Sequence, residues 1–149
     1  PYVPPTDAKP IALGEPGVYG CGKDLCIISY GNGYYLSRQA EKQLAEQGIQ
    51  CTVIDLRWLA PLNQSAILQQ VAGHQQVLIV DECRQTASIS EALVTMLSEH
   101  PTGIHNIQRV CAQDCFIPLG SASYEVLPKT QDIVNAALNM LSKTIREAS

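Results

Sequence analysis

The sequence has no long apolar run and no basic stripe, and each absence excludes a class of function. No apolar stretch approaches the roughly 18 residues that a membrane-spanning helix needs, and no secretory signal is visible. The 10 lysines and arginines are scattered among 14 acidic residues, so nothing predicts nucleic-acid binding. What is present, 149 residues of which 46% are hydrophobic, predicts one globular domain with a real core.

The six cysteines lack the spacing of a metal site or a redox pair. None forms C-x-x-C, and the nearest pairs, Cys21 with Cys26 and Cys111 with Cys115, match zinc-site spacing poorly. Cys26 and Cys51 lie inside apolar runs, where a free thiol behaves as a small hydrophobic group. We therefore predict reduced structural cysteines, no metal site and a cytoplasmic setting, with the mitochondrial matrix left open.

Prolines at positions 1, 4, 5, 10 and 16 mark the beginning of the chain. They predict a proline-rich linker over residues 1–16 that follows an upstream domain, and a single domain over residues 17–149. The first residue is Pro1 rather than Met, so we expect a segment cut from a longer chain.

Apolar runs alternate with helical periodicity through the rest of the sequence. The predicted strands cover residues 17–22, 25–30, 51–57, 76–82 and 107–111, and the predicted helices cover 34–47, 63–72, 88–97 and 130–145. Strands separated by helices imply crossover connections, and hence a mostly parallel sheet in a three-layer αβα domain of the α/β class.

Helix caps support these boundaries. Asn63 and Thr130 are predicted N-caps, and Ser88 with Glu91 has the spacing of a capping box. Gly48 and Gly73 are predicted to end the helices that precede them.

Polar residues follow the carboxyl ends of the predicted strands, which meet at one edge of a parallel sheet, where ligands gather. These residues either bind a partner or substrate, or only cap strands whose backbone must leave the core. We predict interface or structural roles, with no catalytic, cofactor-binding or metal-binding residue, for the following set: Tyr30, Gly31, Asp55, Arg57, Glu82, Arg84 and Asp114.

Other candidates have simpler explanations. Gly31-x-Gly33 offers backbone amides to an anion, but it lacks the third glycine of a dinucleotide fingerprint and the Gly-Lys-Ser/Thr of a P-loop. Arg84 could activate the Cys83 thiol, although no histidine is near in sequence.

The remaining candidates are histidines and aromatic residues. We interpret His74, His100 and His105 as surface residues, because they lie in or beside predicted loops and lack metal-ligand spacing. Trp58 and Tyr124 are either interface anchors or ordinary half-buried aromatic residues.

Five stretches in order resemble the C-terminal domain of the beta subunit of thiamine-diphosphate-dependent 2-oxoacid dehydrogenases, within the transketolase C-terminal domain family. They are Asp24-Leu-Cys-Ile-Ile-Ser-Tyr-Gly31, Val53-Ile-Asp-Leu-Arg57 with Pro61-Leu-Asn63, Val77-Leu-Ile-Val-Asp-Glu82 with Arg84, Asp114 with Ile117-Pro118, and Leu127-Pro128 with Asp132-Ile-Val134. The similarity covers about residues 11–140, and Ile11-Ala-Leu-Gly14 resembles the segment that joins this domain to the preceding one.

The resemblance implies a five-stranded sheet whose short first strand is an antiparallel edge strand. It implies a parent enzyme that oxidatively decarboxylates pyruvate or a branched-chain 2-oxoacid and passes the acyl group to a lipoyl carrier. Thiamine diphosphate and Mg would be bound mainly by other domains. This domain, inactive by itself, would build the interface of a homodimer and help dock the lipoyl acyltransferase component.

The sequence departs from the family pattern at two places. Asn63 replaces the usual Asp, which changes little because either residue can cap a helix. The segment from Thr86 to Glu91 replaces a glycine-rich turn, which restricts the backbone.

Three alternatives stay open. The chain could belong to a deoxyxylulose phosphate synthase or transketolase, act as a stand-alone non-catalytic adaptor, or bind a small-molecule regulator at the strand ends. The sequence preceding Pro1 would separate the first two from the leading interpretation.

Overall fold

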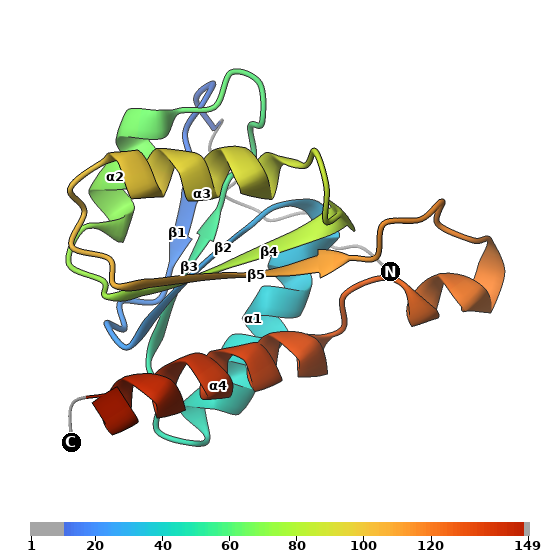
Figure 1. Ribbon diagram of the computed structural model, residues 1–149. Coiled ribbons are helices and arrows are strands. Elements are labelled where there is room, and N and C mark those ends of the chain that lie inside the picture. Colours follow the sequence, from blue (N-terminus) through green and yellow to red (C-terminus); the bar gives the residue numbers. More distant parts are fainter. Residues whose placement is uncertain (1–10, 148–149) are drawn as a thin grey trace, which may run out of the picture.

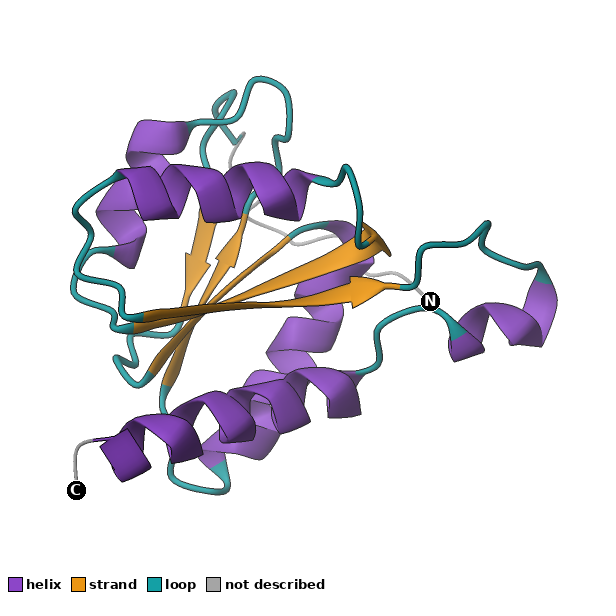
Figure 2. Ribbon diagram, viewed as in Figure 1, coloured by secondary structure: helices purple, strands orange, loops and turns teal. Residues whose placement is uncertain are grey.

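Five strands form one sheet in the order β1-β3-β2-β4-β5, with helices on both faces (Figure 1, Figure 2). The computed structural model describes residues 11–147, with side chains up to residue 142. The strands are β1 (Gly17–Tyr19), β2 (Leu25–Ser29), β3 (Cys51–Asp55), β4 (Gln76–Arg84) and β5 (Asn106–Ala112). The helices are α1 (Gly31–Ala45), α2 (Gln64–Val71), α3 (Ile89–Glu99), the 3-10 helix η1 (Gly120–Glu125) and α4 (Thr130–Glu147).

The sheet is parallel except at one edge, which confirms the predicted α/β class. β1 pairs antiparallel with β3, and Gly17 lies opposite Asp55. The pairs β2–β3, β2–β4 and β4–β5 are parallel. Of the predicted linker, residues 1–10 lie outside the described residues, and residues 11–16 contain no helix or strand.

The core consists of two apolar layers, one on each face of the sheet. α1 and α4 cover one face and contribute Leu44 and Ile133 to its cluster. α2 and α3 cover the other and contribute Ile67 and Leu93. Every residue of the central strand β2 is buried, because its side chains alternate between the two layers, and this explains its continuous apolar run.

Two predicted helix signals are confirmed. The Asn63 side-chain oxygen accepts a hydrogen bond from the Ala66 amide at 3.1 Å and caps α2. At the end of α1, the Ile49 amide donates to the Leu44 carbonyl across Gly48, as in a Schellman motif.

Two predicted helix starts are wrong in detail. α1 begins at Gly31, so both glycines of the Gly31-x-Gly33 turn lie inside the helix. Thr130 is already helical and its hydroxyl donates to the Gln39 side chain, while Asp132 accepts from the Lys129 amide. The Thr130 hydroxyl therefore bonds to a distant helix instead of capping α4, and Asp132 bonds to the residue that precedes the predicted cap.

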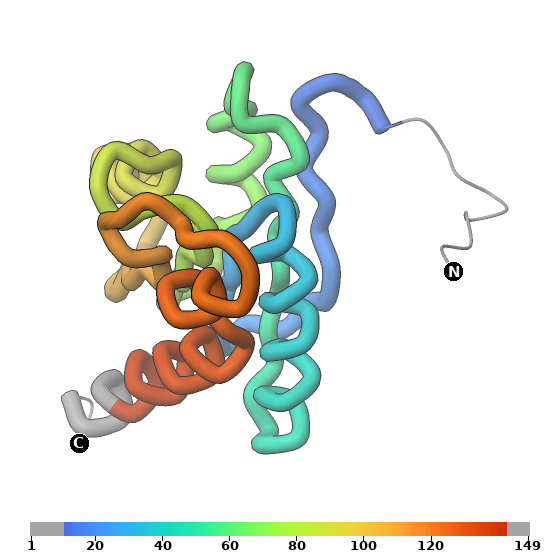
Figure 3. The backbone as a smooth tube through the Cα atoms, turned by 90° about the vertical axis from the view of Figure 1, so that its right-hand side faces the viewer, coloured from blue at the N-terminus to red at the C-terminus, as the bar shows by residue number. Residues whose placement is uncertain are grey.

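The segment between β5 and α4 leaves the body of the domain. It projects beyond the carboxyl end of β5 and contains η1 (Figure 1, Figure 3). Between residues 11 and 147, no helix has both the length and the apolar character needed to cross a membrane.

Candidate functional site: the carboxyl edge of the sheet

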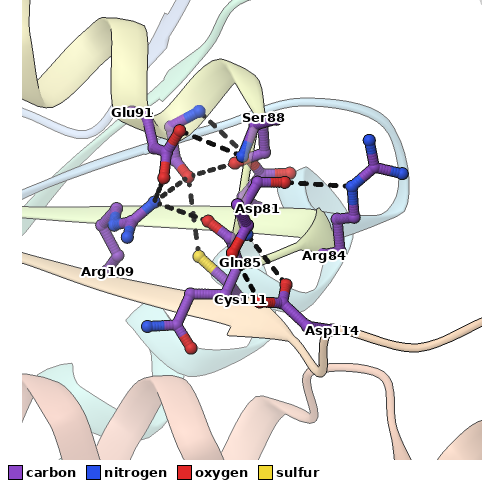
Figure 4. Close-up of polar contacts among 11 residues, drawn as sticks. Asp81, Arg84, Gln85, Ser88, Glu91, Arg109, Cys111 and Asp114 are labelled. Carbon is purple, nitrogen blue, oxygen red and sulfur yellow. Dashed lines mark hydrogen bonds and ion pairs between the residues drawn. The ribbon is translucent and has the colours of Figure 1, made fainter.

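Asp81, near the end of β4, organises the carboxyl edge, by which we mean the edge where β2 to β5 end. Its carboxylate accepts hydrogen bonds from the Tyr30 hydroxyl at 2.5 Å, the Cys83 amide at 2.9 Å and the Ser90 amide at 3.0 Å. The side chain is fully buried. Asp81 therefore links the end of β2 to the end of β4 and to the first turn of α3. Figure 4 shows Asp81 among the polar residues around this turn.

A bulge in β4 makes this arrangement possible. Asp81 pairs with Cys111, but the next pair along the two strands is Arg84 with Ala112. The extra residues bend the strand, so that the Cys83 amide turns back to the Asp81 carboxylate. The bulge also explains why β4 extends two residues beyond the predicted end.

The carboxylate of Asp81, and not the predicted capping box, caps the start of α3. The hydroxyl of Ser88 contacts the Ser90 hydroxyl at 2.7 Å and makes no cap bond to the helix. Glu91 reaches back to the Ala87 amide at 3.0 Å. The capping box is therefore wrong as predicted, because a carboxylate from a neighbouring strand receives the first-turn amide of Ser90.

The hydrogen bonds at Asp81 favour its ionised form. Burial alone would raise the pKa of the Asp81 carboxyl, but bonds from Tyr30, Cys83, Ser88 and Ser90 overcome this and hold the pKa below its ordinary value. Burial and the bond to Asp81 raise the pKa of the Tyr30 phenol. The two shifts agree that a neutral phenol donates to a carboxylate.

Gly31 and Glu82 lie side by side at the start of α1. A Cβ atom on Gly31 would come within 2.5 Å of the Glu82 carboxylate, and the φ angle of Gly31 is 54°. The Glu82 side chain is flexible and could move aside, so the positive φ angle is what favours glycine here. The carboxylate thus occupies the positive end of the α1 dipole, where the sequence suggested a weak anion site.

Asp55 and Arg57 form a second group with Tyr19. The Arg57 Nε atom lies 3.8 Å from the Asp55 carboxylate, and its Nη2 atom donates to the Tyr19 hydroxyl at 3.1 Å. Burial raises the pKa of the Asp55 carboxyl even though the amide and charge of Arg57 lower it. The φ angle of Arg57 is 57°, which is unusual for a residue with a side chain. The group holds the edge strand β1 to β3.

Arg84 and Asp114 meet through Thr86, which sequence reasoning did not single out as a site residue. The Thr86 amide and hydroxyl both donate to the Asp114 carboxylate, at 2.8 and 2.5 Å, and the Thr86 carbonyl accepts from Arg84 Nε at 3.0 Å. The bonds from Thr86 hold the pKa of Asp114 below its ordinary value. We call the Thr86–Asp114 contact the clasp.

Arg109 of β5 was also missed. Its guanidinium donates to the Gln85 carbonyl at 3.0 Å and to the Ser90 hydroxyl at 3.1 Å, and lies 3.9 Å from the Glu91 carboxylate (Figure 4). Sequence analysis considered only polar residues near the carboxyl ends of the predicted strands. Arg109 lies inside the edge strand β5, so it was not among the candidates. It fixes the same turn that Asp81 caps.

The segment from Thr86 to Glu91, which departs from the family pattern, contains a residue with a strained backbone conformation. Ala87 has a φ angle of 56°, a left-handed conformation that favours glycine. Replacing Ala87 with Gly is expected to stabilise the chain by about 0.5–1 kcal/mol, since relief of strain exceeds the added entropy of the unfolded chain. Urea denaturation measures the change. Ala92→Gly, on the exposed face of α3, is the matched control and should destabilise by about 1 kcal/mol; equal effects of both would contradict the strain.

His74 is not on the surface, contrary to the prediction. It is 1% exposed, and its ring nitrogens lie 3.2 Å from the Val71 carbonyl and 3.1 Å from the Gly22 carbonyl. It links the end of α2 to the turn before β2. His100 and His105 are exposed, as predicted. The six cysteines are free thiols, and burial raises the pKa of Cys26 and Cys51 to about 12.

Most of the exposed large hydrophobic side chains lie at or near the carboxyl edge. Those of residues 11–142 are Ile11, Leu13, Val18, Tyr35, Trp58, Leu59, Phe116, Ile117, Leu119 and Tyr124. They come from the segment before β1 and the middle of β1, from the first half of α1, and from the segments that follow β3 and β5. The turns at the opposite edge, 20–24, 46–50, 72–75 and 100–105, contribute none of them. The two candidate anchors, Trp58 and Tyr124, are both in this set.

The polar side chains of the carboxyl edge do not fit thiamine diphosphate and Mg, the cofactors that the resemblance implies for a parent enzyme. Among the side chains that the structure describes, those of residues 11–142, no group of three or more His, Cys, Asp and Glu is placed to hold a metal ion. A diphosphate at the start of α1 would meet the Glu82 carboxylate. The polar groups described above instead hold elements together, and we assign no catalytic step to them.

Comparison with known proteins places the chain in a family. The model of the family described as transketolase, C-terminal domain, matches residues 18–133, so the chain belongs to that family. The pyruvate dehydrogenase E1 component subunit beta of Bacillus subtilis is 30% identical over 141 residues, which are 92% of this chain and 43% of that protein.

Two further proteins agree with this. The acetoin:2,6-dichlorophenolindophenol oxidoreductase subunit beta of Cupriavidus necator is 27% identical over 136 residues, 89% of this chain and 40% of that protein. A solved structure described as a split gene transketolase, inactive beta4 tetramer, superposes with a TM-score of 0.78 at 22% identity, over 94% of this chain and 47% of that one. The resemblance is confirmed, and the chain spans less than half the length of these relatives.

Proposed function

We propose that this domain serves the assembly of a thiamine-diphosphate-dependent 2-oxoacid dehydrogenase first component. The parent enzyme would oxidatively decarboxylate pyruvate or a branched-chain 2-oxoacid and transfer the acyl group to a lipoyl carrier. The similarity to pyruvate dehydrogenase beta subunits supports this assignment. The domain would bind neighbouring subunits, a second copy of itself and the lipoyl acyltransferase component, in the cytoplasm or the mitochondrial matrix.

The observation that carries the assembly role is the one-sided distribution of exposed hydrophobic side chains. Apolar groups gathered on one edge, and bordered by polar residues, are typical of a protein interface. The predicted set from Tyr30 to Asp114 lies within this edge, where its hydrogen bonds fix the backbone that presents the apolar residues. Thiamine diphosphate and Mg would then be bound by other domains of the parent.

An activity assay tests the non-catalytic part of the proposal. The purified chain, supplied with thiamine diphosphate, Mg²⁺ and an artificial electron acceptor, is expected to show no turnover of pyruvate or branched-chain 2-oxoacids. A complete 2-oxoacid dehydrogenase first component serves as the positive control. Decarboxylation by the chain alone would refute the proposal.

A stand-alone adaptor of the same fold is the second candidate, and one observation favours it. The segment from Thr86 to Glu91 contains a non-glycine residue in a left-handed conformation, where the family pattern supplies glycines. A deoxyxylulose phosphate synthase or transketolase parent remains the alternative within enzymes. Cofactor-binding motifs upstream in the same gene, or their absence, would separate the adaptor from both enzymes.

A further inference from the structure

The outer side of β5 is an open edge of the sheet. β5 is the last strand in the order β1-β3-β2-β4-β5, and it pairs with β4 on its inner side. It crosses the front of the molecule between α3 above and α4 below (Figure 1, Figure 2). Within residues 11–147, no further strand continues the sheet beyond it. An open edge presents backbone groups that can bind another strand.

The register of β4 and β5 identifies the backbone groups that face outward. The Asn106 amide donates to the Gln75 carbonyl at 3.2 Å, so Asn106 directs its backbone groups toward β4. Because this direction alternates along a strand of a parallel pair, the other even-numbered residues of β5 do the same. The N–H and C=O groups of Ile107, Arg109 and Cys111 therefore point outward. Among the described residues, none supplies a backbone hydrogen bond to these groups.

Two further hydrogen bonds agree with this alternation. The Val80 carbonyl accepts from the Ser29 hydroxyl of β2 at 2.8 Å, so Val80 faces away from β5 and its partner Val110 makes the bonds between β4 and β5. Beyond the strand, the Gln113 amide lies on the outer side and donates to the Val126 carbonyl at 3.1 Å. The open stretch thus ends before Gln113, and it is about 16 Å long at about 3.3 Å per residue.

β5 lacks the features that usually protect an edge strand. Natural edge strands are short, or carry proline, lysine or a bulge. β1, at the opposite edge, has three residues and follows Pro16. β5 has seven residues without proline or lysine, and the bulge of the β4–β5 pair lies in β4. The one charged side chain of β5, Arg109, is bonded to Gln85 and Ser90 around the start of α3. The edge is therefore suited to pairing.

Two hollows border β5, one near each end. The hollow near its start has a volume of about 470 Å³, and its lining includes the apolar side chains of Val94, Leu97, Ile104 and Ile107. The other, of about 430 Å³, lies between the end of β5 and the start of α4. Both volumes fall within the range of ligand pockets, about 300–1,000 Å³. Since successive side chains of a strand point to opposite faces, an added strand can place side chains in both hollows.

The charge around β5 indicates which kind of strand it binds. Residues 88–142 comprise β5, the helices beside it and the segments that connect them, and they carry more acidic than basic side chains. The acidic ones are Glu91, Glu99, Asp114 of the clasp, Glu125 and Asp132, and the basic ones are Arg109 and Lys129. A second copy of the chain would bring two acidic surfaces together, which like-charge repulsion opposes. A segment with basic residues complements the charge instead.

We propose that the outer side of β5 binds an extended, basic segment of a partner protein, which joins the sheet as a sixth strand. Backbone hydrogen bonds to Ile107, Arg109 and Cys111 would supply affinity, and the two hollows would select side chains. This surface lies beside β5 rather than at the carboxyl edge. The inference therefore goes beyond the assembly role proposed above and does not depend on it.

Amide hydrogen exchange of the whole chain, measured residue by residue, tests the proposal. The probe is the peptide Lys-Thr-Val-Thr-Val-Thr-Lys, blocked at both ends, at concentrations up to millimolar. Saturating peptide is expected to slow exchange at Ile107, Arg109 and Cys111 at least about tenfold. Exchange at Gln108 and Val110 should not change, because their amides already bond to β4. The amides of β1 are the control for the opposite edge.

Two N-methylated forms of the peptide separate strand pairing from attraction by charge. One form carries methyl groups on the valine amides and the other carries them on the threonine amides. A paired strand directs only one of these sets toward β5, so calorimetric titration should show affinities that differ at least about tenfold. Equal affinities would show that backbone pairing does not hold the peptide, and would overturn the proposal.

The charge requirement is tested by substitution. Glu99→Gln, at an exposed position of α3, should weaken binding of the peptide about two- to threefold at low salt. Glu46→Gln, at the exposed end of α1, is the matched control and should leave the affinity unchanged. Equal effects of the two substitutions would contradict the role of the acidic side chains around β5.

Three further results would overturn the inference. The first is no binding of the peptide at millimolar concentration, and the second is slower exchange at β1 in place of β5. The third is exchange at Ile107, Arg109 and Cys111 that slows with increasing chain concentration in the absence of peptide, which would identify a second copy as the partner. None of these results bears on the assembly role of the carboxyl edge, which the activity assay tests separately.

Discussion

Replacing Asp81 with Ala is expected to lower the free energy of unfolding by about 3–5 kcal/mol. The substitution removes a fully buried carboxylate and leaves the Tyr30 hydroxyl and the amides of Cys83 and Ser90 without their acceptor. It also removes the negative charge from the first turn of α3. Urea denaturation of both proteins at neutral pH measures the difference.

The effect of Asp81 should depend on pH with a definite sign. Because the folded pKa lies below the ordinary value of 3.8, the stabilisation is complete above that value and is lost as the pH falls through the folded pKa. The difference between the unaltered chain and Asp81→Ala should therefore shrink in this acid range. Asp24→Ala is the control, because Asp24 is exposed and accepts from the Gln50 amide, and it should cost about 1 kcal/mol. If Asp81→Ala lowered the free energy of unfolding by no more than Asp24→Ala does, the central role of Asp81 at the carboxyl edge would be contradicted.

Replacing Gly22 with Ala should cost about 3 kcal/mol, at the upper end of overpacking effects. A Cβ atom at Gly22 would lie 2.1 Å from the Gln50 carbonyl carbon and 2.4 Å from the Cys51 amide nitrogen, so backbone must move against backbone. The Gly22 carbonyl also accepts from the Thr52 hydroxyl and lies 3.1 Å from His74 Nε2, and these contacts would shift with it.

A second glycine separates close approach from backbone conformation. Gly73 has a φ angle of 82° but open space around it, so Gly73→Ala should cost about 1 kcal/mol from backbone strain alone. Thermal or urea unfolding compares the two variants. If both variants lost the same stability, the close contact between Gly22 and the backbone at the start of β3 would not be what requires glycine at position 22.

Patterns within about ten residues predicted most of the fold. The apolar runs located all five strands, and Asn63 and Gly48 marked true helix ends, because each of these signals acts on its own neighbourhood. The antiparallel direction of β1 came from the family resemblance, since three residues carry no information about strand direction. The assignment of residues 1–16 as a linker and 17–149 as a domain stays a prediction.

Long-range hydrogen bonds explain what the sequence could not reveal. Asp81 and Glu82 are adjacent acids at a strand end, yet only Asp81 is fully buried, and its partner Tyr30 is 51 residues away. His74 looked like a loop residue because its partner at Gly22 is 52 residues away. The role of Thr86 depends on Asp114, which lies after β5 and 28 residues away in the sequence. The predicted site residues therefore lie together at one edge of the sheet, and their interface role stays a prediction. The hydrogen bonds among them depend on pairing across the sheet, which the sequence does not reveal.

The interface role of the carboxyl edge is tested most directly by amide hydrogen exchange. Exchange in the complete parent enzyme is compared with exchange in the isolated chain, region by region. We expect protection in the assembly to increase at residues 11–16, 57–60 and 115–124, while the turns at 20–24, 46–50, 72–75 and 100–105 stay unchanged. Protection that increases at those four turns and not at the carboxyl edge would contradict the proposed role.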